Sequence, residues 1–426
     1  MAIRDVIVSV AFARNGRGWT QSRIAAWPSP VRRLFAARLL RSVAQGCLVV
    51  DFALYLRLLH WTGSGIGAVL AGSFILGAGL SLLVGPASDR FGCKRLLIGY
   101  EVAVAFAFFA AAWSTNPMVI ASAAMFAGFG RGANGAPGCF VPVELNWLAG
   151  FVPAAQRGAA YSLNAAAGLL GMGLGALLAI APALSPHALP GASGYRPLFL
   201  AGGVLALGVA GLLATTPERR EFESRASGLL SLPLAHDERR RLWLLGLISL
   251  FSGVSLGLSG PLISYWFAVK FHLDPMRIAP VLAAAYFTAT LAAAGIGKFA
   301  RRFGAARSFV VLQGAGAVLL LGFPFLPTFP LAAAVWILRF AIERGATGAM
   351  EAVMMTLVGG GRRGLAGGLG TAALALPRGL GPLMAGGWIA ANDFAAPFLL
   401  AATLQAVYVV LFGAAFCSQD RDIADF

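Results

Sequence analysis

Long apolar runs, separated by short polar or charged links, fill almost the whole 426-residue chain. An α-helix needs about 20 apolar residues to cross the hydrocarbon core of a bilayer, and each run is close to that length or longer. The pattern therefore predicts twelve membrane-spanning helices and leaves no room for a soluble domain. The predicted spans are 34–60, 66–87, 96–114, 117–141, 158–181, 196–215, 242–268, 278–300, 307–326, 330–357, 365–390 and 396–417.

The composition agrees with an all-α membrane protein. Hydrophobic residues make up 58% of the chain and charged residues only 12%, and the mean hydropathy is +0.78. Soluble domains carry roughly 25% charged residues. The 54 glycines suit helices that pack closely in lipid.

Basic residues are distributed unevenly between the two sides of the predicted bundle. A net charge of +16 on a soluble protein would suggest a nucleic-acid partner, but here 23 lysines and arginines fall in links on the side of the N-terminus and four on the other side. Basic links mark the cytoplasmic side of membrane proteins. We therefore expect no nucleic-acid partner and a multi-pass protein of the cytoplasmic (inner) membrane, with both termini in the cytoplasm.

Two fragments of the chain resemble each other. Residues 85–95 and 297–307 share two glycines, two arginines and a phenylalanine at an offset of 212, and both lie between apolar runs. Such internal duplication is typical of secondary transporters. Two further matches follow in the same order, residues 131–136 with 344–349 and residues 173–179 with 379–385, at offsets of 213 and 206.

The duplication predicts two six-helix halves joined by a charged link. We place the halves at residues 34–215 and 242–417, with a solvated cytoplasmic linker at 216–241. A basic tail at 1–33 and a short tail at 418–426 complete the chain.

The link between spans two and three resembles the signature of the major facilitator superfamily. That resemblance implies twelve helices in two pseudo-symmetric halves, a central cavity, a small-molecule substrate and a monomer in the lipid bilayer. The second copy has Arg301 where the signature has its acidic residue. The residues that carry the resemblance are Gly85, Asp89, Arg90, Gly92, Lys94 and Arg95.

The chemistry of this link suggests a gate. Gly85 and Gly92 permit close approach and a tight turn, and the three basic residues hold the link in the cytoplasm. In the family the acidic residue lies near the start of span eleven, so the resemblance implies that Asp89 locks the halves together. The alternative is that the link is only a topology anchor.

Charged residues within the spans are candidates for the transport machinery, because a charge in lipid is costly unless it faces a partner or water. Asp51 in span one and Arg131 in span four are predicted to carry and to switch a proton. The segment 51–55 is similar to the span-one acidic segment of multidrug/proton antiporters. A static ion pair, or no contact between the two residues, are the alternatives. Ala176 stands where the antiporter signature of span five has a proline.

Span ten carries a second set of charges. Arg339 and Glu343, four residues apart, are expected to pair on one helix face. Glu343 and Glu351 are the next proton-coupling candidates, as the only other carboxylates expected well inside the spans. Arg378 lies between a proline and a glycine, where we expect a distorted helix and an anion-binding side chain; snorkelling or pairing with Glu351 is the alternative. The substrate-cavity candidates are Arg378, Arg344, Tyr161, Tyr265 and Tyr286.

Nothing in the sequence indicates an enzyme. A phosphate-binding Gly-x-x-x-x-Gly-Lys-[Ser/Thr] loop is absent, and the four cysteines and four histidines are dispersed, so we expect no cofactor, no metal site and no direct use of ATP. The sequence favours a secondary transporter that exports a small molecule in exchange for protons. Import of a sugar or organic acid is the alternative, and a non-transporting receptor or scaffold is a minor one.

Overall fold

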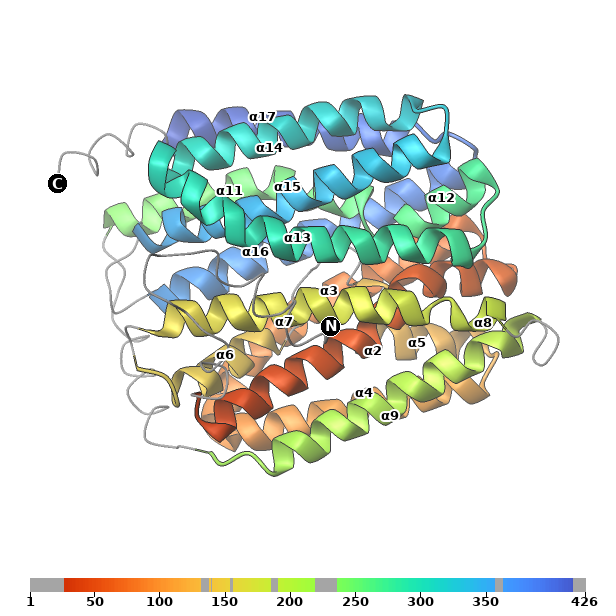
Figure 1. The fold of residues 1–426 in the computed structure, drawn as a ribbon, viewed down its shortest axis with the longest axis horizontal. Coiled ribbons are helices and arrows are strands. Elements are labelled where there is room, and N and C mark those ends of the chain that lie inside the picture. The colour runs from red at the N-terminus through yellow and green to blue at the C-terminus, as the bar shows by residue number, and fades with distance from the viewer. Residues whose placement is uncertain are drawn as a thin grey trace, which may run out of the picture.

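The computed structural model of the chain describes residues 27–131, 138, 140–153, 156–184, 191–218, 236–356 and 363–416. In these residues the regular structure is helical, and Figure 1 shows long helices lying side by side in two groups. The N-half contains α2 (Ser29–Leu58), α3 (Gly63–Phe91), α4 (Cys93–Trp113), α5 (Pro117–Ala127), α6 (Val141–Ala149), α7 (Arg157–Leu178), α8 (Ala181–Leu184), the 3-10 turn Gly191–Tyr195 and α9 (Arg196–Ala214). The C-half contains α11 (His236–Ser259), α12 (Ile263–Phe271), α13 (Pro275–Phe303), α14 (Ala305–Gly322), the 3-10 turn Phe323–Phe325, α15 (Phe329–Thr356), α16 (Arg363–Ala390) and α17 (Ala396–Phe416).

Each predicted span overlaps one of these helices or a pair of them, and the all-α membrane fold is confirmed. Within the described residues eight helices are long and apolar enough to cross a membrane, and the bent pair Trp243–Ser259 and Ile263–Phe271 adds a ninth. Large apolar side chains cover the outside of the bundle; Phe106, Trp113 and Met118 are each at least 69% exposed. Such a surface is costly in water and suits a lipid environment.

Span four differs from the prediction, because it is not one helix over residues 117–141. The 11-residue helix α5 ends at Ala127, where Gly128 and Gly130 adopt left-handed backbone conformations with φ of 74° and 71°. Glycine takes these angles without a Cβ clash, so the two glycines end the helix. Eleven residues rise about 16 Å, roughly half of a ~30 Å hydrocarbon core, so the break lies near mid-membrane.

The duplication seen in the sequence is also present in the turns. Gly92 joins α3 to α4 with φ 84° and ψ 148°, and Gly304 joins α13 to α14 with φ 88° and ψ 146°. These angles favour glycine over residues with a side chain. The two copies of the fragment therefore build the same turn.

The helix packing repeats as well. A Cβ on Gly175 of α7 would lie 2.7 Å from Cα of Gly46 on α2, and a Cβ on Gly381 of α16 would lie 2.5 Å from Cα of Gly257 on α11. In each half a first helix thus crosses a fifth helix with glycine against glycine. Glycines let two helix backbones approach closely, as is common in membrane bundles.

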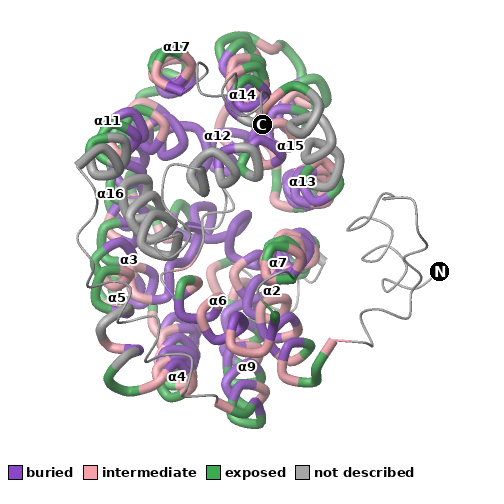
Figure 2. The backbone as a smooth tube through the Cα atoms, turned by 90° about the vertical axis from the view of Figure 1, so that its left-hand side faces the viewer, coloured by how far each residue is buried: buried purple, intermediate pink, exposed green. Residues whose placement is uncertain are grey.

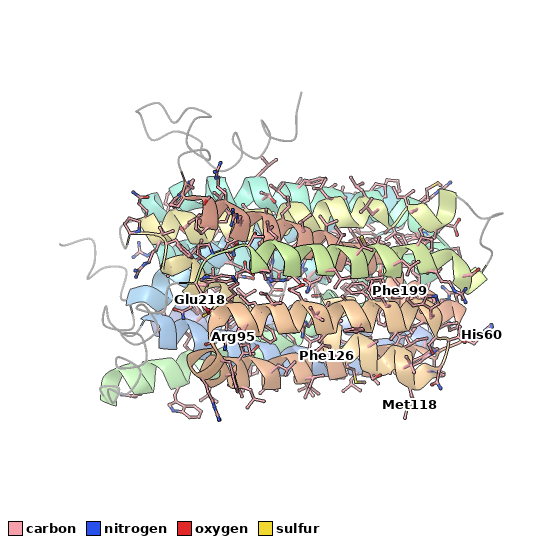
Figure 3. The ribbon with its side chains drawn as sticks, turned by 90° about the horizontal axis from the view of Figure 1, so that it is seen from below. His60, Arg95, Met118, Phe126, Phe199 and Glu218 are labelled. Atoms are coloured by element: carbon pink, nitrogen blue, oxygen red, sulfur yellow. The ribbon has the colours of Figure 1, made fainter. Side chains whose placement is uncertain are left out.

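The bundle has two distinct ends (Figure 3). Arg95 and Glu218 lie at one, which we call the basic end, and His60 and Met118 lie at the opposite one, the far end. Figure 2, viewed along the helices, shows the C-half above the N-half, with exposed segments along the outer rim.

Contacts between the halves occur near the far end. A Cβ on Gly63 of α3 would lie 2.3 Å from the carbonyl oxygen of Gly386 on α16, and one on Gly67 would lie 2.1 Å from that of Pro382. Ser264 of α12 also donates a hydrogen bond of 3.4 Å to the carbonyl oxygen of Val49 on α2. The two halves are therefore closely packed at the far end.

Candidate functional site

The α3–α4 turn is tied to the end of α9. The amide of Lys94 donates to Oε1 of Glu218 at 3.0 Å, and its Nζ donates to the carbonyl oxygen of Ala214 at 2.7 Å. A Cβ at Gly92 would lie 2.6 Å from the same Glu218 oxygen, so the glycine leaves room for the carboxylate. The sequence interpretation assigned Glu218 to the solvated linker and missed this contact.

The structure describes the surroundings of only some of the other signature residues. Arg90 and Arg95 are exposed, and the Arg90 guanidinium carbon lies 5.4 Å from the ring centre of Phe91. Gly85 and Asp89 belong to α3, but the surroundings of Gly85 and the side chain of Asp89 lie outside the described part of the chain. The gating role of Asp89 stays a prediction.

Asp51 lies buried on α2, with Cys47 and Tyr195 within electrostatic reach. The residue is 0% exposed, and neither carboxylate oxygen has a hydrogen-bond partner among the residues that the structure describes. Its helix neighbours Val50 and Phe52 are buried too. A buried carboxylate needs a cation, a donor or water when it is charged, and the protonated acid needs much less. Whether Asp51 is charged or protonated therefore depends on whether a conformational change brings it a cation, a donor or water.

The predicted pair between Asp51 and Arg131 is not formed. Arg131 instead donates from Nη1 to the carbonyl oxygen of Ser73 on α3 at 2.9 Å. Its guanidinium folds back over Gly128, where a Cβ would lie 2.7 Å from Nη2. The break after α5 brings Arg131 to the C-terminal end of that helix, where the helix dipole and carbonyl oxygens favour a cation. The backbone therefore compensates Arg131 in part, since Nη2 is buried and has no hydrogen-bond partner among the described residues.

A second network in the N-half links four helices, and the sequence interpretation missed it. Arg41 of α2 binds Glu101 of α4 through Nε at 2.5 Å and binds Glu144 of α6 through Nη1. Glu144 also accepts from Nδ2 of Asn164 on α7 at 2.9 Å. Arg38, one turn before Arg41, lies within electrostatic reach of Glu144. Two arginines and two glutamates thus balance one another.

The expectation that Glu343 and Glu351 are the only other carboxylates inside the spans is therefore wrong. Glu101 and Glu144 are 1% and 2% exposed. Glu101 is the single acidic residue of an apolar run, and the rule that identified Asp51 would have found it. Glu144 lies beyond the predicted end of span four, and only the break in that span returns it to the interior.

The C-half carries a second buried cluster, formed mainly on α15. The predicted pair of Arg339 and Glu343 is confirmed, with Nη1 and Oε2 3.0 Å apart. The other oxygen of Glu343 accepts from Nη2 of Arg344 at 2.7 Å. Arg339 also donates to Oγ of Ser259 on α11 at 3.4 Å. One carboxylate therefore holds two guanidinium groups.

Arg378 reaches this cluster from α16. The residue is 8% exposed and lies within electrostatic reach of Glu343 and Arg344. α16 continues through Pro377 and Pro382 without a break. Proline has no N–H, so Pro382 frees the Arg378 carbonyl oxygen from its helical bond. Gly257 packs against this oxygen, at 2.2 Å from its would-be Cβ. We call Arg339, Glu343, Arg344 and Arg378 the arginine cluster.

The remaining candidates are dispersed. Tyr286 of α13 packs edge-on against Phe340, with ring centres 5.2 Å apart, and lies within electrostatic reach of Arg344. Tyr265 lies at the far end, with the Arg57 guanidinium 6.0 Å from its ring centre. Tyr161 is a half-buried residue of α7.

Only Arg344, Arg378 and Tyr286 of the predicted cavity residues therefore come together with Glu343. Glu351 belongs to α15, but its side chain lies outside the described residues. Over the part of the chain that the structure covers, no three His, Cys, Asp or Glu side chains gather as metal ligands would.

Comparison with known proteins gives one family and many similar folds. The family description of the Major Facilitator Superfamily matches residues 34–342. The nucleoside transporter NupG is 15% identical with a TM-score of 0.69, over 91% of this chain and 99% of NupG. A D-xylose–proton symporter is 16% identical with a TM-score of 0.70, over 90% and 96% of the two chains. The human organic anion transporter MFSD10 is 18% identical with a TM-score of 0.61, over 90% and 100%. A search of curated protein sequences gives no match.

Proposed function

We propose that this chain, which belongs to the major facilitator superfamily, couples the movement of a small molecule across the membrane to the movement of protons. The chain is a transporter and not an enzyme. Alternating access needs two halves that can close at one end while the other end opens. The close packing of the two halves at the far end supports that mode of action.

The orientation follows from charge. Basic links favour the cytoplasm, so the basic end faces the cytoplasm, with both termini inside and the chain in the inner membrane. The contact of Gly63 with Gly386 then closes the outer side. The conformation described above would accordingly be closed to the outside.

The observation that carries proton coupling is the isolation of Asp51. This carboxyl group is fully buried and has no hydrogen-bond partner within the described ranges, yet its helix contacts the opposite half through Val49. Separation of the halves would alter the surroundings of the group. Because the charged form needs water or a cation and the neutral form does not, proton uptake and release follow the conformation.

The direction is proposed as export in exchange for protons, because segment 51–55 resembles that of multidrug/proton antiporters. Import of a sugar or an organic acid is the second candidate. The similar fold of a D-xylose–proton symporter supports proton-coupled import in general. The arginine cluster favours an acid over a sugar, because guanidinium groups bind anionic oxygens.

Proteoliposomes test the coupling. A counterflow screen of nucleosides, sugars, organic acids and drug-like compounds would first identify a transported molecule. A pH difference of one unit, coupled to one proton, sustains about a tenfold gradient of that molecule. Asp51→Asn should abolish this gradient and retain exchange. Asp393→Asn removes an exposed carboxylate and should match wild type.

Accumulation by Asp51→Asn equal to that of wild type would contradict the assignment. Glu343 and Glu351 would then be the next carboxylates to test. A folded protein that exchanges no compound would favour the receptor or scaffold alternative.

A further inference from the structure

The arginine cluster has an excess of positive charge. Among the described side chains, three guanidinium groups lie around the carboxylate of Glu343, which leaves a formal charge of +2. Counting Glu351 as a further neighbour would still leave +1. A buried charge without a counter-charge is costly, so a site of this kind is completed by an anion.

We propose that the transported molecule carries a carboxylate, sulfonate or phosphate group, which binds at the arginine cluster with Arg378 as its direct contact. The proposal rests on the transport function above and names its substrate class. It applies to export of an organic anion and to import of an organic acid alike.

Among the described residues, Arg378 is the arginine of the cluster that makes no hydrogen bond to Glu343. Glu343 binds Arg339 and Arg344 instead. The Nε atoms of Arg339, Arg344 and Arg378 are all buried and have no partner. An arginine presents donors in a planar fork that matches two oxygens of one anionic group. The residue is therefore equipped to bind an anion and lacks one within the described protein.

An exposed residue of α15 lies next to the cluster. Thr347 lies three residues after Arg344 and four after Glu343, so all three share one face of α15. Thr347 is exposed, whereas Glu343 and the preceding residue of that face, Phe340, are buried. The charged face of α15 thus becomes exposed one turn closer to the basic end, so a residue at Thr347 can report on the charge of the cluster.

Arg378 is also well placed to connect binding with conformation. The next residue, Gly379, packs against the other half, with a would-be Cβ 3.2 Å from the carbonyl oxygen of Ala71 and 3.1 Å from Cγ1 of Ile75. An anion that pulls on Arg378 therefore acts on the α3–α16 contact between the halves. Ligand binding can shift a two-state equilibrium when it favours one state by contacts such as this.

A thiol-labelling experiment tests the charge of the site without knowledge of the substrate. Thr347→Cys is made in a variant with Cys47, Cys93, Cys139 and Cys417 replaced by alanine. The purified protein then reacts with an anionic and a cationic methanethiosulfonate of similar size. Thr328→Cys, at an exposed turn of the far end, corrects for intrinsic reactivity.

We expect the anionic reagent to be preferred at Thr347→Cys by at least about tenfold over the reference, since unit charges near a cation cluster differ by more than 1.4 kcal/mol. The preference should fall when Arg378→Gln is added and stay when Arg277→Gln is added, because Arg277 is exposed on α13. Equal rates, or no reaction with either reagent, would overturn the proposal.

A counterflow panel tests the substrate class. The panel pairs carboxylates and sulfonates with their primary amides, which keep the shape and lose the charge. Wild type should exchange acids and reject the amides, and Arg378→Gln should lose at least about tenfold of the acid exchange. Arg378→Lys retains the charge and should retain part of the exchange, whereas a purely structural role would not separate acids from amides.

The outcomes distinguish this proposal from proton coupling. Exchange of amides or cations as fast as acids, still driven by a pH gradient, would overturn the anion proposal and leave the proposed function standing. Selective exchange of acids without pH dependence would do the reverse. If wild type exchanges no compound, the transport function fails, and the labelling ratio still decides whether the site attracts anions.

Discussion

Met172 of the N-half and Arg378 of the C-half occupy equivalent positions. A Cβ on Gly46 would lie 2.5 Å from the carbonyl oxygen of Met172, and a Cβ on Gly257 would lie 2.2 Å from that of Arg378. The same helix crossing thus buries a thioether in one half and a guanidinium in the other. A duplicated scaffold tolerates very different chemistry at one position, provided that the backbone contact is preserved.

The buried charges follow the same division. In the N-half, Arg41 binds two carboxylates and the network is balanced. In the C-half, three arginines share Glu343. At the offset of 212, Glu101 corresponds to Gln313, which is hydrogen-bonded to Gln405 at 2.8 Å. The Arg41 network of the N-half pairs its charges with one another, whereas the arginine cluster of the C-half carries an excess of positive charge among the described side chains.

Spans four and ten differ for a reason visible in their sequences. Gly130 precedes Arg131 in span four, whereas Glu343 precedes Arg344 in span ten. Gly128 and Gly130 end the helix and leave Arg131 near its end, where Nη1 donates to the carbonyl oxygen of Ser73. The glutamate keeps α15 continuous and binds the neighbouring arginine directly. Two substitutions between the repeats, Gly128 for Ala341 and Gly130 for Glu343, thus accompany the change in both the backbone and the partner of the arginine.

The largest expected effect comes from breaking the balanced network. Arg41→Ala leaves Glu101 and Glu144 buried without their cation, and loss of one partner of a buried ion pair costs about 3–5 kcal/mol. We expect a large drop in the thermal unfolding midpoint of the detergent-solubilised protein, or failure to fold.

A neutralised variant tests whether charge is the cause. Arg41→Met combined with Glu101→Gln and Glu144→Gln removes the whole set of charges and should recover much of the lost stability, because similar-sized uncharged groups often replace buried ions well. Arg41→Ala with an unchanged unfolding midpoint would mean that the N-half does not depend on this network.

A smaller effect is expected from the packing that the halves share. Gly175→Ala and Gly381→Ala each place a Cβ within 2.2 Å of facing backbone, so both should destabilise by about 1–3 kcal/mol. Gly208→Ala on α9 meets nothing within 4 Å and should be neutral or slightly stabilising. The measurement is again thermal unfolding. Unequal losses for the two glycines would show that the halves are not equivalent at this crossing.

Sequence reasoning recovered what periodicity and repetition encode. The spans and the duplicated turns at Gly92 and Gly304 could be predicted, because apolar length and glycine conformation are local properties. The pair of Arg339 and Glu343 could be predicted for the same reason, since both residues lie on one helix face. Separations along one element are fixed by helix geometry.

Contacts between different helices were harder to predict from the sequence. The Arg41 network joins residues from four helices, and no sequence spacing relates them. The expected pair of Asp51 and Arg131 depended on two helices being level, and the break after Ala127 gave Arg131 a backbone partner instead. The tendency of Gly128 and Gly130 to end a helix is a local property that the sequence shows. The resulting positions of Arg131 and Glu144 depend on how the other helices pack, which the sequence does not show.

The smallest expected effect has the opposite sign to the first. Arg378→Met installs the residue that the N-half has at this position and removes a buried guanidinium whose Nε has no hydrogen-bond partner among the described residues. Replacing such a charge by an apolar group of similar volume should raise stability by about 1 kcal/mol, seen as a higher unfolding midpoint. The gain should come with a loss of transport, as is common when a strained functional group is removed. The reverse change, Met172→Arg, places a new charge in the balanced half and should destabilise. A lower midpoint for Arg378→Met would mean that Arg378 already has a counter-charge, and the contrast between the two halves would then not extend to this position.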